Sequence, residues 1–338
     1  TYGDALAPFV RKLDIPEATS VDPLRFSDDD LLERRASYGK AGFSLQFQLS
    51  TQLSDADRFP LKVRDIIFLA FDKERAPMQL TWGPYEARIL NDLPNVAMRG
   101  DRMYGPMSVG DVSSEFTGTV MAIDPSGRGA DETGYAVVKM LNGYLYVSEC
   151  GGPPGGYDDE TLGTLAEIAK RNDTNAIVVE SNFGDGMFVK LLEPVLRKRH
   201  PCAIEEVRHS SQKERRIIDT LEPVLMRHKL VIDPAVVEHD YRSAQRYDSA
   251  VRLGKMLMYQ LTRVTADRNA LRHDDRLDAL SMAVGYWVEQ MSVDDKDGID
   301  RHNDEMLRGE LEAFMRGAGV ASGRSNKPNW IGNMIDKT

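Results

Sequence analysis

The chain is constrained most by a stretch near its middle, where two apolar segments flank a glycine-rich turn. Residues 118–124 are small or apolar until the last position, Asp124, and Pro125 follows at once. Proline removes a backbone donor and ends a strand, and the glycines after it let the chain turn back into residues 135–141. A carboxylate at the end of a buried strand is costly unless a cation lies against it. The stretch therefore predicts a sheet that holds a cation-binding acid at one strand end.

Length, charge and cysteine content narrow the class of protein. With 338 residues, 41% of them hydrophobic, the chain can bury one large core or two modest ones. The formal net charge is -10, yet residues 190–275 carry 17 Lys and Arg against 13 Asp and Glu. Because binding follows the local field, a basic face on this acidic chain is compatible with nucleic acid. Two cysteines without paired spacing predict neither a disulfide framework nor a zinc site.

Targeting and nucleotide-binding signals are missing from the sequence. It holds no apolar run of about eighteen residues and no signal peptide, so we expect an intracellular protein with no membrane partner. It also lacks the G-x-x-x-x-G-K-[ST] loop by which many ATPases bind phosphates. We therefore expect no ATPase activity from this chain.

The order of the predicted elements indicates an α/β fold. Strands at 118–124, 135–141 and 144–150 are joined by tight turns and predict an antiparallel meander. Helices and short strands then alternate, which predicts parallel strands and a mixed sheet with helices on both faces. The later elements are predicted as helices at 158–171, 183–200, 211–228, 234–245 and 273–291, and as strands at 175–180, 203–207 and 230–233. We place the main domain at residues 116–293.

The regions on either side of this domain are less regular. Residues 1–115 predict a helical and irregular linker region, with a helix that begins after Ser27 and one or two strands within 61–82. Residues 294–338 are acidic and then glycine-rich, which predicts a mobile C-terminal tail.

Two further groups of acids also lie at the ends of predicted elements, as Asp124 does. Glu180 also ends an apolar segment, and Asp274, Asp275 and Asp278 open a predicted helix. A helix N-terminus favours negative groups, and residues three apart share a face, so Asp275 and Asp278 can point at one site. Each group alone has an ordinary explanation: a turn, a pair with an arginine, an acidic helix cap. Their joint order, two strand ends and a helix start, favours a common site.

The chemistry of such a site follows from its ligands. Carboxylates without histidine or cysteine partners suit Mg²⁺ or Mn²⁺. Two such ions about 3.5–4 Å apart stabilise both the attacking and the leaving oxygen of a phosphoryl transfer. The pattern therefore predicts a two-metal hydrolase that acts on phosphodiesters.

Three motifs make the chain resemble a known family. The runs D-P-S-G-x-G-x-D-E-T at 124–133, V-V-E-S-N-F-G at 178–184 and H-D-D-R-L-D-A-L at 273–280 resemble the large terminase subunit of tailed double-stranded-DNA phages, in particular the short-tailed type. Segments at 43–49 and 210–216 are similar as well. The resemblance covers about residues 20–290. It implies a ribonuclease H-like nuclease that cuts concatemeric DNA during packaging in the host cytoplasm.

By the same resemblance, functional roles are carried over to single residues. Asp124, Glu180 and Asp275 fall where the family has its catalytic, metal-binding acids, with Asp274 and Asp278 as further candidate ligands. The implied partners are double-stranded DNA, the portal, the small terminase subunit and the ATPase part of the same protein. The family's P-loop domain is absent here, which implies that residues 1–115 include the end of the motor part.

Basic residues in and beside the segment at 210–216 predict contacts with DNA. The candidates are Lys213, Arg215, Arg216 and Arg208. Because the resemblance to the family includes its segment, Lys213 is the first candidate for a phosphate contact near the site. Three other classes fit parts of the pattern: an actin-like ATPase, a non-catalytic DNA clamp or portal-docking module, and a resolvase of the same fold. The first lacks a second phosphate loop. The presence of all three acid groups disfavours the clamp, and the similar segment at 43–49 disfavours the resolvase.

Overall fold

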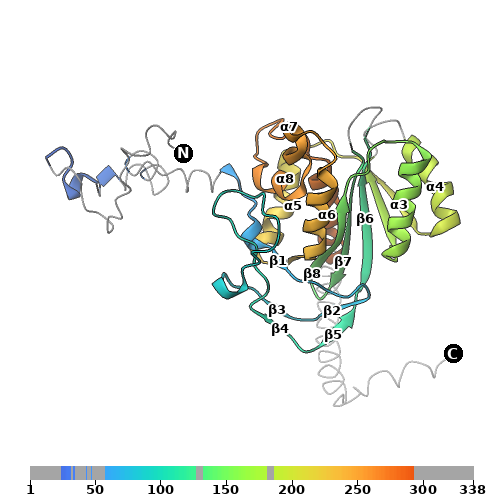
Figure 1. Cartoon of the computed structure of the whole chain (residues 1–338), viewed down its shortest axis with the longest axis horizontal. Helices are drawn as coiled ribbons and strands as arrows, with labels where there is room; N and C mark the ends of the chain where they lie inside the picture. Colours follow the sequence, from blue (N-terminus) through green and yellow to red (C-terminus); the bar gives the residue numbers. More distant parts are fainter. Residues whose placement is uncertain are drawn as a thin grey trace, which may run out of the picture. The chain divides into compact units, whose positions relative to one another are not determined.

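A computed structural model gives the architecture of the chain (Figure 1). It describes residues 58–126, 132–180 and 186–292, together with a few positions between 24 and 47. The chain divides into two compact units, residues 1–283 and 284–338. The sheet and the acids discussed below all belong to the first unit. None of the described helices is long and apolar enough to cross a membrane.

A mixed sheet forms the centre of the first unit. Within the described residues it has seven strands, in the order β1-β11-β8-β7-β6-β9-β10. The pairs β8–β7 and β7–β6 are antiparallel, and the other four pairs are parallel. The strands are β1 (Ile67–Phe68), β6 (Gly118–Asp124), β7 (Gly134–Leu141), β8 (Tyr144–Gly151), β9 (Ala176–Glu180), β10 (Ala203–Val207) and β11 (Leu230–Ile232). The predicted meander followed by parallel strands is confirmed.

Helices cover both faces of this sheet (Figure 1). On one face, α3 and α4 pack through apolar side chains such as Leu165 and Leu192 against Met121 and Val137 of the strands. The other face is covered by α5, α6 and α8. The helices are α3 (Asp159–Arg171), α4 (Met187–Arg199), α5 (Lys213–Met226), α6 (Pro234–Ala244), α7 (Ser249–Arg252), α8 (Leu257–Arg263) and a last helix whose described residues are 275–292.

Local sequence explains where the helices begin. Asp158 caps α3 by accepting a hydrogen bond from the Thr161 backbone nitrogen, and Asp233 caps α6 in the same way. Between α6 and the last helix, the sequence predicted no element, whereas the structure has α7, η4 (Leu253–Lys255) and α8. Each of these helices has two turns or fewer. Such short helices show no clear amphipathic periodicity in the sequence.

The region before residue 116 contributes to the same unit. It contains η2 (Val63–Asp65), η3 (Glu86–Arg88) and two small antiparallel sheets. Those sheets pair β2 (Arg75–Pro77) with β5 (Ser113–Glu115) and β3 (Leu80–Thr81) with β4 (Ser108–Val109). The strand predicted within 61–82 includes β1, which lies at the edge of the central sheet beside β11. A boundary near residue 115 stays a prediction, and the predicted tail at 294–338 lies outside the described residues.

Candidate active site

Two of the predicted acids lie at the carboxyl ends of neighbouring strands. β6 and β9 pair in parallel, with Ile123 opposite Val179, so the next residues, Asp124 and Glu180, end their strands side by side. Pro125 follows Asp124 and cannot donate to the sheet. Both acids therefore lie at the same edge of the sheet, at the carboxyl ends of their strands. Residues 127–131 and 181–185, which follow these strand ends, lie outside the described part of the chain.

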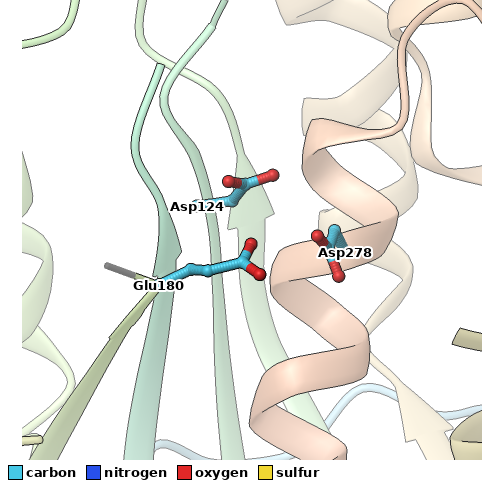
Figure 2. A group of neighbouring side chains, drawn as sticks. All are labelled: Asp124, Glu180 and Asp278. Atoms are coloured by element: carbon cyan, nitrogen blue, oxygen red, sulfur yellow. The ribbon is translucent and has the colours of Figure 1, made fainter. Parts of the chain in front are cut away.

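The third acid comes from the last helix. Figure 2 shows Asp278 on this helix, facing Asp124 and Glu180 across a short gap. One carboxylate oxygen from each of the three residues lies within 4.8 Å of the other two. Asp278 is fully buried, whereas Glu180 is 8% exposed. The three carboxylates thus form one cluster built from two strands and a helix.

The other two acids of the helix start have different partners. The carboxylate of Asp275 lies 3.5 Å from the ammonium of Lys255, and that of Asp274 lies 3.0 Å from the ammonium of Lys213. The structure thus brings Asp278, rather than the Asp275 chosen from the sequence, into the cluster with Asp124 and Glu180. The positions differ because the helix begins at residue 275, so Asp278 lies almost one turn in, on its inner face. The buried Leu277, Leu280 and Ser281 on either side of Asp278 are the sequence signal for this choice.

Two side-chain cations lie among these acids. The Lys213 ammonium is 3.2 Å from Asp124 and 2.9 Å from Asp278, besides its contact with Asp274. The Arg216 guanidinium donates to both oxygens of Asp278, at 2.7 and 3.1 Å, and lies 3.7 Å from Glu180. Both residues belong to the first turn of α5. The predicted proximity of Lys213 to the acids is therefore seen in the structure.

The other predicted basic residues lie differently. Arg208 and Arg215 are exposed, and their contact with DNA stays a prediction. The sequence did not single out His209, whose Nδ1 lies 3.2 Å from a Glu180 oxygen. A lone histidine beside a basic run carries no spacing that marks it. An open pocket of about 260 Å³ is lined by Asp124, Glu180, His209, Ser211, Lys213 and Arg216.

Burial and mutual repulsion change how these groups ionise. Burial raises the pKa of Asp124 from 3.8 to about 8; the Lys213 ammonium opposes this shift, and the carboxylates of Asp278 and Glu180 add to it. Burial, followed by the Asp278 carboxylate, also raises the pKa of Glu180. Burial disfavours the charge of Lys213, but the carboxylates of Asp278, Asp124 and Asp274 outweigh it and raise its pKa. The cluster therefore attracts cations strongly and holds a proton readily.

The donor set suits a hard divalent cation. All three clustered groups are carboxylates, no cysteine takes part, and Mg²⁺ and Mn²⁺ prefer oxygen ligands. The pKa of Asp124 is raised chiefly by burial, and the carboxylates of Asp278 and Glu180 add to this rise, so a cation bound here would stabilise the ionised form. Asp124, Glu180 and Asp278 are thus the residues able to hold such an ion.

Comparison with known proteins gives sequence relatives of one kind. Residues 123–230 match the family model described as the ribonuclease H-like domain of the bacteriophage T7 terminase. Over 298 residues the chain is 45% identical to the large terminase subunit of Enterobacteria phage T3, an alignment that covers 87% of this chain and 51% of that protein. The chain spans about half the length of this curated relative.

Three solved structures to which the chain is similar at low identity and low TM-score are terminase nucleases. The nuclease domain of the large terminase subunit of bacterial virus Sf6 is 14% identical, with a TM-score of 0.35 over 51% of this chain and 89% of that one. The large terminase nuclease of thermophilic phage G20c is 11% identical, with a TM-score of 0.33 over 67% of this chain and 97% of that one. A manganese-soaked terminase nuclease domain of human cytomegalovirus is 12% identical, with a TM-score of 0.33 over 50% and 82%.

Proposed function

This chain belongs to the phage large terminase subunits and carries their ribonuclease H-like domain, and we propose that it is the nuclease that cuts concatemeric viral DNA during genome packaging. The observation that supports the proposal most is the convergence of Asp124, Glu180 and Asp278 from three separate elements. A fold needs no such cluster for stability, because like charges held together disfavour their own ionisation. A site that breaks a local rule in this way is typical of function.

The proposed reaction is hydrolysis of a DNA phosphodiester with Mg²⁺ or Mn²⁺. Asp124, Glu180 and Asp278 hold the ions, and geometry favours Asp278 over Asp275 as the third ligand. When bound, the ions supply Lewis-acid stabilisation of the phosphoryl oxygens and lower the pKa of an attacking water.

The remaining side chains of the pocket prepare these acids. Arg216 donates to both oxygens of Asp278 and so fixes its orientation. His209 does the same for Glu180 through one bond. Lys213 is the mobile point charge of the set: its flexible stem lets the ammonium leave a carboxylate and contact a phosphate oxygen of the DNA.

The wider setting follows from the family. We infer that double-stranded DNA is the substrate, with the portal, the small terminase subunit and the ATPase part of the same protein as partners, in the host cytoplasm. The exposed Arg208 and Arg215 are proposed to contact the DNA backbone beside the pocket.

A plasmid-cutting assay with Mg²⁺, Mn²⁺ or EDTA tests the proposal. Wild type should cut only with metal, and Asp124→Ala and Glu180→Ala should each abolish cutting without changing the circular dichroism spectrum. Asp278→Asn and Asp275→Asn form a matched pair that differs by less than one helical turn. The first should abolish cutting, and the second should retain at least part of it. DNA binding without any cutting by wild type would instead favour the clamp or portal-docking module.

A further inference from the structure

A second cluster of charges lies buried behind the acid site. Arg276 is completely buried, and so is its partner Glu132, while Asp240 is 2% exposed. Arg276 donates from Nε to one Glu132 oxygen at 3.0 Å and from Nη2 to the other at 2.8 Å. Its Nη1 donates to an Asp240 oxygen at 2.7 Å and to the Ser243 hydroxyl at 3.0 Å. The guanidinium is thus held on both sides by carboxylates.

The cluster is complete in charge and in hydrogen bonds. Glu132 also accepts bonds from Arg246 at 2.8 Å and from the Tyr247 hydroxyl at 2.7 Å. Asp240 accepts a hydrogen bond of 2.8 Å from the backbone nitrogen of Leu257, at the start of α8. Two carboxylates therefore meet two guanidinium groups. A buried pair of this kind is weak evidence for stability, since apolar residues of equal volume often serve as well. Its presence calls for another reason.

The connections of the cluster supply that reason. Arg276 is two residues before Asp278, on the first turn of the same helix. Glu132 is two residues before Gly134, the first residue of β7, which pairs directly with Asp124 of β6. The bidentate pair of Arg276 with Glu132 therefore joins the helix turn that carries Asp278 to the strand pair that carries Asp124. It is a short and stiff connection between two of the three clustered acids.

The backbone is in close contact at the same place. A Cβ atom added at Gly134 would lie 2.2 Å from the carbonyl oxygen of Asp275, so any side chain there would push the helix start away from β7. The Leu277 backbone nitrogen donates to the buried Gln260 side chain at 3.0 Å, which fixes the same turn from α8. The turn between Asp275 and Asp278 is thus held by contacts that involve neither the acid cluster nor its cations.

We propose that Arg276, with Glu132 and Asp240, is a positioning residue that sets the distance between Asp278 and Asp124 and thereby the affinity of the site for a divalent cation. The proposal rests on the proposed function, since it assumes that these acids bind the ion. Residues that orient metal ligands from behind typically affect affinity 10–100-fold. We therefore expect a loss of about tenfold in Mn²⁺ affinity when Arg276 is replaced by lysine, which keeps the charge but cannot form the bidentate pair with Glu132.

The experiment is a Mn²⁺ titration of the full chain, with free Mn²⁺ measured by electron paramagnetic resonance. Arg276→Lys keeps the charge and loses the two-armed bond to Glu132. Gly134→Ala moves the helix start without touching any charge, and it serves as the second variant if Arg276→Lys does not fold. The control is Arg171→Lys, which breaks another two-armed pair, to Glu149, on a helix that carries none of the site acids. Near-ultraviolet circular dichroism and melting in EDTA report folding separately.

Weaker Mn²⁺ binding by about tenfold in Arg276→Lys and Gly134→Ala, with the control unchanged, supports the positioning role. A merely structural role would lower the melting temperature of all three variants and leave the Mn²⁺ affinity of the folded protein as in wild type; that result overturns the proposal. Failure of wild type itself to bind Mn²⁺ would refute the proposed metal site first, and the positioning role with it. Absence of Mn²⁺ binding by wild type thus refutes the proposed function, whereas unchanged Mn²⁺ affinity in the variants refutes only the positioning role.

Discussion

The replacement of Asp124 by asparagine should stabilise the metal-free protein at neutral and alkaline pH. Asparagine keeps the shape of the side chain and removes its charge. The Asp124 side chain is only 15% exposed, and its pKa is raised by burial from 3.8 to about 8 in spite of the Lys213 ammonium beside it. Its charged form is therefore less stable in the folded chain than in the unfolded chain, where the ordinary value applies.

The sign of the pH dependence follows from linkage. A group whose pKa is raised by folding contributes stability that is fully present below about pH 4 and is lost as the pH rises through about 8. At about 1.36 kcal/mol per pKa unit, the rise from 3.8 to about 8 gives this loss an upper bound of about 6 kcal/mol. Relaxation and water entry reduce it, and we expect about 2–3 kcal/mol. For a domain of this size that corresponds to roughly 4–12 °C in melting temperature.

The assay is thermal melting in EDTA between pH 5 and 9. Wild type should lose stability steadily over this range, whereas Asp124→Asn should show a flatter profile and melt higher than wild type at pH 9. With Mn²⁺ at a thousandfold excess over the dissociation constant the order should reverse, because only wild type gains from binding, by about 4.1 kcal/mol. Asp274→Asn is the matched control, since it loses a contact with the same Lys213. If Asp124→Asn melts lower than wild type in EDTA and still shifts fully with Mn²⁺, the reasoning is wrong.

Three further outcomes are expected. Lys213→Ala should lower DNA cutting more than Arg197→Ala, because Lys213 contacts the site acids and Arg197 forms an exposed pair with Glu193; equal losses in the plasmid assay would make Lys213 an ordinary surface charge. The chain should hydrolyse no ATP, since its sequence has no P-loop, and phosphate release by a clean preparation would contradict this. DNA binding should weaken steeply between low and physiological salt in a filter-binding assay, because the contacts come from a local basic face on a chain of net charge -10; a flat salt profile would exclude phosphate contacts as the main source of affinity.

The sequence predicted much of the sheet because β6, β7 and β9 are rich in apolar residues, and because β6 and β9 each end at an acid. β6 and β10 were predicted at their observed bounds, and Asp124 and Glu180 were proposed as site acids because each ends an apolar strand. The sequence alone did not separate the three candidates for the third acid, because Asp274, Asp275 and Asp278 lie within about one helical turn of one another. Which of them faces Asp124 and Glu180 depends on how the start of the helix packs against the sheet. That packing involves Gly134 and Glu132, which are distant in sequence. The positioning role proposed for Arg276 could not be predicted from the sequence either, because its partner Glu132 is 144 positions away and leaves no local pattern.

The charges of the pocket explain why its acids tolerate one another in the absence of metal. Four carboxylates, those of Asp124, Glu180, Asp274 and Asp278, are in contact with two side-chain cations, Lys213 and Arg216. Two negative charges are left over if all four acids ionise. A proton on Asp124, whose pKa is raised to about 8, removes one of them near neutral pH. On the proposed function, a bound divalent cation would neutralise this surplus and would compete with the Asp124 proton.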